Sequence, residues 1–367
     1  MTYPASFTAP IRLAFEQADH LRRLQGGMLA AAGAAPAETP YRVLHAQAGV
    51  ALRRYGDRSS EGMPLLLVPA PIKRCYIWDL LPAASVVRRA LERGLRVYLV
   101  DWTPVENPAR EFALGDYGGR LLLACADAIR GDSGQQAILL AGHSLGGTLA
   151  TIFACLHPQR VRKLALLEAP LHFAAAAGSF APLVAAVHDA TPIAAMFGSV
   201  PGSFLDWMSV LAAPDEFERQ RFADLWSCAG DAGALAVHMR VERWLLDEFS
   251  MPGGLFADIV ERLYRDDLLM RGLLRIEERK AGPAELAVPL LNVFDPRSAV
   301  IPPQSILAFH YAAASRSKKL LEYAGDVGVG IQHVGILVGR RAHAQLWPAV
   351  LDWLLDRETP VHGARRH

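Results

Sequence analysis

Uniformly apolar strands alternate with helices along most of this chain, and this pattern constrains its fold more than any other feature of the sequence. PLLLVPA (64–70), LRVYLVDW (95–102) and AILLAG (137–142) are predicted to be buried strands, and helical segments separate them at 86–94 and 115–130. Strands that are apolar on both faces and are spaced by helices form a mostly parallel sheet covered by helices. The predicted fold class is therefore α/β.

The same pattern divides the chain into an arm, a core and a cap. Residues 1–40 form the arm, residues 41–170 and 286–367 carry the strands of the core, and residues 171–285 are helix-rich with no clear buried strand. A helical block inserted late between strands of a parallel sheet is predicted to cover the strand ends, where ligands bind in such sheets. Three further strand signals complete the core: a hairpin around Gly49 (41–56), LAVPLLNVF (286–294) and KKLLEYAG (318–325).

Composition excludes several classes of function. The net charge is +1, so no bulk field favours nucleic acid as a partner. The four cysteines are widely spaced and lack metal-ligand spacing, so we expect reduced thiols and no metal site. The first residues lack a signal-peptide pattern, and the apolar runs are shorter than the roughly 20 residues of a membrane span. These features predict a cytoplasmic protein.

The run AILLAGHSLGGTLATIF (137–153) places Ser144 between an apolar strand and a helix of small residues. A serine in G-x-S-x-G at such a turn is held on a strained elbow as a nucleophile, which is typical of the α/β-hydrolase fold. His143 is predicted to pack and to point away from the site. The sequence therefore predicts an α/β-hydrolase fold with an inserted helical cap.

A nucleophilic serine needs a base and an acid, which follow it in this fold in the chain order Ser, acid, His. His333 lies in GDVGVGIQHVGILVG (325–339), a predicted loop after the final strand, and is the candidate base. Asp295 directly follows the strand PLLNVF, and Glu168 ends the strand in LLEAP. Either carboxylate can reach the histidine, and we favour Asp295 with Glu168 as the alternative. Four other histidines are predicted to lie on the surface or in the core: His157, His172, His238 and His310.

The oxyanion hole should use the backbone N–H of the residue after the nucleophile, Leu145, and one from the loop after PLLLVPA. Prolines at 69 and 71 have no N–H, so Ile72 is the predicted second donor, with Ala70 behind it. This chemistry requires neither a cofactor nor a metal.

The residues around these motifs resemble the poly(3-hydroxyalkanoate) synthases, especially their short class III type, from about residue 41 to 356. PLLLVPAPIKRCYIWDL resembles the strand and oxyanion segment of that family, and LRVYLVDW and LGDY resemble its Asp-Trp and Asp-Tyr elements. In the predicted cap, ERWLLDEFSMPGGLFADIVERLYRDDLLMRG is similar to the family's Trp, Asp, Pro-Gly, Tyr and Leu pattern. Generic esterases do not share this cap pattern.

The resemblance implies an enzyme that polymerises (R)-3-hydroxyacyl-CoA thioesters into polyester granules. Ser144 and His333 match the family's nucleophile and histidine, and CoA enters as part of the substrate. The candidate partners are the hydroxyacyl-CoA or a hydroxyalkanoate ester, a partner synthase subunit, a second copy in a homodimer, and the granule surface.

Two departures from the family pattern bear on the reaction. The family's nucleophile is cysteine, and this chain has Ser144. A serine oxyester lies further downhill from a CoA thioester than a cysteine thioester does, so water or an alcohol becomes a more plausible final acceptor. The family's acid falls where this chain has Ser298, in SAVIP, so that the acid is either displaced or absent.

Three hypotheses follow. The first is an acyltransferase of the polyhydroxyalkanoate synthase type, with Ser144 as nucleophile, His333 as base, Asp295 as acid, and Leu145 and Ile72 as oxyanion donors. The second is an esterase, thioesterase or polyhydroxyalkanoate depolymerase on the same scaffold. The third is a catalytically retired, granule-associated binding subunit.

Overall fold

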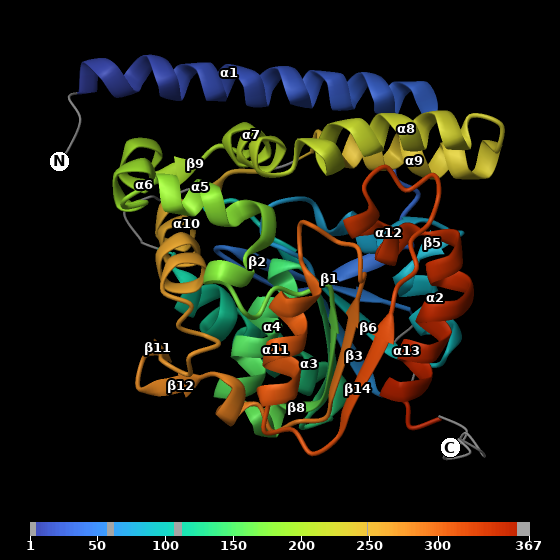
Figure 1. Cartoon of the computed structure of the whole chain (residues 1–367). Helices are drawn as coiled ribbons and strands as arrows, with labels where there is room; N and C mark the ends of the chain where they lie inside the picture. Colours follow the sequence, from blue (N-terminus) through green and yellow to red (C-terminus); the bar gives the residue numbers. More distant parts are fainter. Residues whose placement is uncertain (1–4, 57–61, 106–111, 248, 358–367) are drawn as a thin grey trace, which may run out of the picture.

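An eight-stranded sheet organises the chain, and helices cover both of its faces (Figure 1). The structure is a computed structural model that describes residues 5–56, 62–105, 112–247 and 249–357. The strand order is β1-β2-β6-β3-β7-β8-β13-β14, in which β1, β2 and β6 pair antiparallel and all later neighbours pair parallel. The strands are β1 (Tyr41–Gln47), β2 (Val50–Tyr55), β3 (Pro64–Val68), β6 (Arg96–Trp102), β7 (Ile138–His143), β8 (Val161–Leu167), β13 (Leu290–Phe294) and β14 (Lys318–Glu322). The predicted fold class is confirmed.

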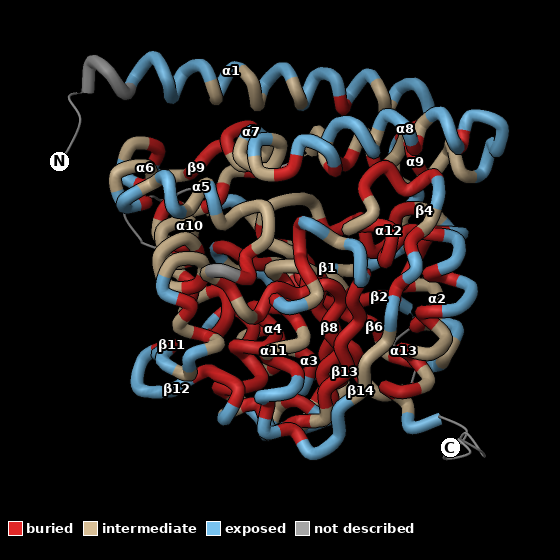
Figure 2. The backbone as a smooth tube through the Cα atoms, viewed as in Figure 1, coloured by how far each residue is buried: buried red, intermediate tan, exposed pale blue. Residues whose placement is uncertain are grey.

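The sheet separates two hydrophobic cores, because successive side chains of a strand point to opposite faces. Leu66 and Val68 of β3 belong to one core, and Leu65 and Leu67 of the same strand belong to the other. This is why β3 is apolar and buried at every position, and Figure 2 shows that the centre of the sheet is buried. The helices packed around the sheet are α2 (Val86–Glu92), α3 (Leu121–Ser133), α4 (Leu145–Leu156), α11 (Pro303–Ala312), α12 (Gln332–Val338) and α13 (Trp347–Leu354).

Residues 171–285, which we call the cap segment, lie between β8 and β13. They contain α5 (Ala181–Ala186), α6 (Thr191–Phe197), α7 (Gly202–Ala212), α8 (Gln220–Cys228), α9 (Ala232–Leu245) and α10 (Gly253–Asp258). They also contain two small two-stranded sheets that the sequence did not predict, β9 (Ser199–Val200) with β10 (Met251–Pro252) and β11 (Leu274–Ile276) with β12 (Arg279–Ala281). The division of the chain into independent domains stays a prediction.

The N-terminal helix α1 (Ala5–Leu29) lies across the cap segment, above α7, α8 and α9 (Figure 1). Arg22 donates to the carbonyl of Leu245, and Asp19 accepts from the backbone N–H of Ser203, so one turn of α1 is hydrogen-bonded to the cap segment. Among the described residues, no single helix has the length and apolar character needed to cross a membrane, although the bent pair Gly178–Ala186 and Thr191–Phe197 meets those criteria together.

One local prediction is wrong, and one helix was not predicted. His333 is in a helix and not in a loop, as the second residue of α12. The helix α11 between β13 and β14 was also missed, since its apolar residues show little helical periodicity. All four cysteines are buried and form no disulfide, namely Cys75, Cys125, Cys155 and Cys228, and their reduced state stays a prediction.

Candidate active site

The nucleophile elbow is present at the junction of β7 and α4. Ser144 has φ 55° and ψ −137°, which is a strained conformation for a residue other than glycine. A Cβ at Gly146 would lie 2.3 Å from the Val68 carbonyl oxygen, and one at Gly147 would lie 2.4 Å from the Ala169 Cβ. The turn therefore packs so closely on the neighbouring strand ends that larger residues cannot occupy these positions.

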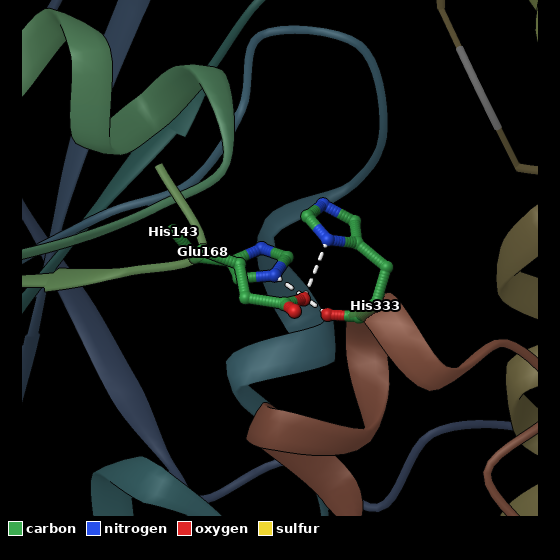
Figure 3. Close-up of side chains that lie close together, drawn as sticks. All are labelled: His143, Glu168 and His333. Atoms are coloured by element: carbon green, nitrogen blue, oxygen red, sulfur yellow. Dashed lines mark hydrogen bonds and ion pairs between the residues drawn. The ribbon is translucent and has the colours of Figure 1, made fainter. Parts of the chain in front are cut away.

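His333 is held by Glu168. The Glu168 carboxylate Oε2 lies 2.8 Å from His333 Nδ1, and its side chain is 1% exposed (Figure 3). Glu168 directly follows β8 and has a positive φ of 44°, which marks a strained turn at the strand end. A carboxylate only accepts, so Nδ1 carries the proton and Nε2 keeps its lone pair. That is the tautomer which a general base needs.

Asp295, the favoured acid in the sequence, is engaged elsewhere. Its carboxylate accepts from the Arg297 backbone N–H at 2.8 Å and from the Arg297 guanidinium at 3.2 and 3.3 Å. Its own backbone N–H donates to Glu168 Oε1 at 3.3 Å. The expected order of the two acids is therefore reversed: the alternative, Glu168, binds the histidine, and Asp295 supports Glu168 through its backbone.

Opposing effects act on the pKa of the buried Glu168 carboxylate beside His333. Burial raises the pKa of Glu168, while the hydrogen bond and charge of His333 lower it and nearby Asp295 raises it. A carboxylate with almost no solvent is stabilised chiefly by the imidazole beside it. In serine triads, an acid in this place holds the imidazole in one tautomer and stabilises the imidazolium that forms during the reaction.

His143 contacts His333, so the prediction that it points away from the site is wrong. The two rings lie 4.5 Å apart between centroids, and His143 Nε2 lies 2.9 Å from the His333 carbonyl oxygen (Figure 3). Burial, and then the neighbouring His333, hold the pKa of His143 well below its usual value, so this ring is neutral and donates from Nε2. His143 therefore fixes the first turn of α12 through the backbone carbonyl of His333.

Ser144 and His333 line the same cavity of about 150 Å³, together with Leu145 and Ile72. The loop that carries Ile72 is fixed by Trp102, whose Nε1–H donates to the Pro69 carbonyl at 2.8 Å. Leu145 begins α4, where backbone N–H groups have no partner within the helix and the helix dipole favours negative charge. The structure thus places all four residues at one cavity, and the oxyanion roles of Leu145 and Ile72 stay predictions.

Apolar side chains of the cap segment extend this cavity. A second cavity of about 150 Å³ also includes Ile72 and Leu145 and continues among apolar residues of the cap segment. Its further lining includes Phe180, Leu183, Ile193, Phe204, Met208 and Phe256. On the other side of His333, a polar cavity of about 600 Å³ contains Glu168, Asp295 and Ser298.

Within the part of the chain that the structure describes, two groups of side chains could hold a metal ion by proximity alone. The potential ligand atoms of His143, Glu168 and His333 lie within 4.8 Å of one another, and so do those of Asp224, Cys228 and His238. In the first group, each residue already makes a hydrogen bond suited to the histidine base described above. The expected absence of a metal stays a prediction.

Comparison with known proteins shows which fold and which family this chain shares. Residues 83–226 match the family described as the alpha/beta hydrolase fold. A monoacylglycerol lipase from Paleococcus ferrophilus superposes with a TM-score of 0.53 at 15% identity, covering 84% of this chain and 99% of the lipase. A likeness at this identity shows the fold alone.

Relatives named poly(3-hydroxyalkanoate) polymerase subunit PhaC include the following three. The subunit of Haloferax mediterranei is 31% identical over 87% of this chain, which spans 64% of that subunit's length. That of Haloarcula marismortui is 30% identical over 88% of this chain and 67% of the subunit. That of Allochromatium vinosum is 25% identical over 95% of this chain and 98% of the subunit. The chain therefore belongs to the family of poly(3-hydroxyalkanoate) polymerase subunits PhaC, and it has Ser144 at the strained turn between β7 and α4.

Proposed function

We propose that this chain is an acyltransferase that takes (R)-3-hydroxyacyl groups from CoA thioesters, with Ser144 as nucleophile, His333 as base and Glu168 as the acid that orients His333. The single observation that carries the proposal is the 2.8 Å contact between Glu168 and His333 Nδ1 at the wall of the cavity that Ser144 lines. The polymerase names of the relatives supply the substrate class.

In the first step, His333 Nε2 takes the proton of the Ser144 hydroxyl as Oγ attacks the thioester carbonyl carbon. The oxyanion is stabilised by the backbone N–H groups of Leu145 and Ile72. When the tetrahedral intermediate collapses, the C–S bond breaks and His333 gives its proton to the departing sulfur, which leaves as CoA. The acyl group stays on Ser144 as an oxyester.

In the second step, the 3-hydroxyl of another hydroxyacyl group attacks the Ser144 ester. His333 takes the proton of that hydroxyl and returns it to Ser144 Oγ as the ester bond to the enzyme breaks. The acyl group has then moved to the new hydroxyl, and the chain has grown by one ester. The apolar cavity between Leu145 and the cap segment has the character needed to hold the acyl chain.

Ser144 itself favours a second candidate, a hydrolase on the same scaffold. If water replaces the hydroxyl in the second step, the products are CoA and a free hydroxy acid. The third hypothesis, a retired catalyst, is less well supported, because the strained backbone of Ser144 and the Glu168–His333 hydrogen bond are features that catalysis requires and packing does not.

Incubation of the purified protein with 3-hydroxybutyryl-CoA separates these candidates. Release of CoA with insoluble polymer supports transfer, and release of CoA with 3-hydroxybutyrate supports hydrolysis. Mass spectrometry should detect an acyl adduct on Ser144, and Ser144→Ala should abolish both the adduct and the release of CoA. Release of no CoA by the wild-type chain would overturn both enzymatic candidates.

The assembly of the chain with itself and with other partners is a separate part of the proposal. We propose that the chain forms a homodimer and acts with a partner synthase subunit at the granule surface. Light scattering of the purified chain before the substrate is added would report the homodimer. A second variant, Ser144→Cys, restores the family's thiol and should raise the share of polymer relative to free acid, because a thioester is a better acyl donor to a hydroxyl.

A further inference from the structure

A buried carboxylate in the cap segment holds the stretch of chain that leads into His333. Asp224 of α8 is 8% exposed, and its Oδ1 accepts the N–H of Gly328 at 2.7 Å. Its Oδ2 accepts the N–H of Gly330 at 2.8 Å. These glycines lie between β14 and α12, shortly before His333. Asp224 thus connects the cap segment to the base by two charge-assisted hydrogen bonds.

His238 of α9 fixes the orientation of this carboxylate. The His238 side chain is 1% exposed, and its Nδ1 lies 2.8 Å from Asp224 Oδ2. Its Nε2 lies 3.6 Å from Glu242 Oε1, which pairs with the Arg221 guanidinium at 2.8 Å. Burial raises the pKa of Asp224, but the hydrogen bonds from His238, Gly330 and Gly328 together hold it below the usual value. The carboxylate is therefore ionised in the folded protein.

The two glycines allow α9 to pack directly on this stretch. Gly328 and Gly330 have φ values of +77° and +72°, which side chains rarely adopt. A Cβ at Gly328 would lie 2.7 Å from the Ala234 Cβ, and one at Gly330 would lie 3.0 Å from Val241 Cγ1. A movement of α8 and α9 would therefore be transmitted to the backbone before His333.

The same cluster contains Cys228, but its geometry favours a hydrogen-bonded role over a metal site. Both oxygens of Asp224 already accept N–H groups, and the Cys228 thiol lies 3.3 Å from the Leu225 carbonyl oxygen. A metal bound to Asp224 would have to displace at least one of these donors.

We propose that Asp224 is a positioning residue for His333: by fixing Gly328 and Gly330 against α9, it sets the place of the imidazole relative to Glu168 and Ser144. His238 supports it by holding the carboxylate. The inference rests on the proposed function only in naming His333 as the base, because the contacts themselves hold whatever the reaction is.

The variant Asp224→Asn tests this. An amide has one oxygen and one NH₂ group, so the NH₂ group must face at least one of the N–H donors and break a hydrogen bond. We expect the low-field proton signal of His333 Nδ1–H to shift or broaden. Labelling of Ser144 by a fluorophosphonate should slow by about tenfold to a hundredfold, because small displacements of a base are costly. The control is Asp215→Asn, which changes an exposed carboxylate just before α8.

A second variant changes the glycine partner of Asp224 and leaves Asp224 itself unchanged. Gly330→Ala strains the same backbone and leaves the Asp224–His238 pair in place. It should therefore change the His333 Nδ1–H signal and slow the labelling of Ser144 in the same way. If Asp224→Asn does not fold, Gly330→Ala is the variant that tests the proposal. The proposal is overturned if folded variants keep the wild-type signal and labelling rate, or if the purified protein holds one equivalent of metal. If the wild type is not labelled but the signal responds as expected, the proposed function fails and the positioning role stands.

Discussion

Replacement of Glu168 by glutamine is the sharpest test of the active site, because it removes one charge and leaves the size of the side chain unchanged. Glu168 Oε2 binds His333 Nδ1 at 2.8 Å, and Oε1 accepts the backbone N–H of Asp295 at 3.3 Å. Glutamine has one oxygen and one NH₂ group, so one of these two donors must lose its acceptor.

The structure indicates which contact is lost and how large the effect is. The contact to Asp295 is the longer one, so the glutamine should turn its NH₂ group toward Asp295 and its oxygen toward His333. His333 then keeps its tautomer but loses the charge that stabilises the imidazolium. Loss of tautomer and charge together lowers kcat by about 10⁴ in serine triads. We therefore expect a fall of about 10³ to 10⁴, which corresponds to about 4 to 5.5 kcal/mol of activation free energy.

The assay is the rate of CoA release from 3-hydroxybutyryl-CoA, with thermal unfolding to show that the variant is folded. The matched control is Asp295→Asn, whose remaining oxygen can still accept from Arg297 and whose backbone N–H is unchanged. We expect that control to keep kcat within about threefold, because the hydrogen bond from its backbone N–H to Glu168 is retained. A larger fall for Asp295→Asn than for Glu168→Gln would refute the assignment of the acid.

Three further predictions concern the elbow, the displaced acid and pH. Gly146→Ala should destabilise the fold by more than about 3 kcal/mol in urea unfolding, because its Cβ would meet backbone atoms of residues 68 and 69, which cannot move aside; a variant of wild-type stability would contradict this packing. Ser298→Asp restores a carboxylate where the family has one, in the cavity that contains Glu168 and His333, and should recover at least about tenfold in rate in the Glu168→Gln background; no recovery would show that residue 298 cannot reach the histidine here. Burial lowers the pKa of His310 and of His343 to about 4, so between that value and about 6.5 the unfolded chain binds protons that the folded chain does not. The stability present at neutral pH is therefore lost as the pH falls, by about 2 kcal/mol for each histidine at pH 5, and glutamine at either position should reduce this loss.

The sheet and the nucleophile could be predicted from the sequence because both depend on neighbours along the chain. Every position of 64–68 is apolar because both faces of that strand are covered, and a run of this kind has few other folded states. The turn around Ser144 is equally local, since the small residues that it requires at Gly146 and Gly147 stand beside it in the chain. The position of His333 after the last strand of the sheet follows from the order of the strands.

The acid and its surroundings could be decided only by the tertiary structure. Asp295 and Glu168 follow adjacent parallel strands, so spacing along the chain cannot tell which carboxylate turns toward the imidazole. The Arg297 guanidinium binds the Asp295 carboxylate, and the Glu168 carboxylate binds His333 Nδ1.

The same limit explains why the contacts of His143 and Asp224 with the His333 region were missed. Their partners lie far away in the sequence and come within 3 Å only when the sheet, the cap segment and α12 have packed together. Short-range patterns in the sequence determine which elements form and where a reactive serine can stand. The direction of a hydrogen-bonded side chain depends on every group around it, and folding alone brings those groups together.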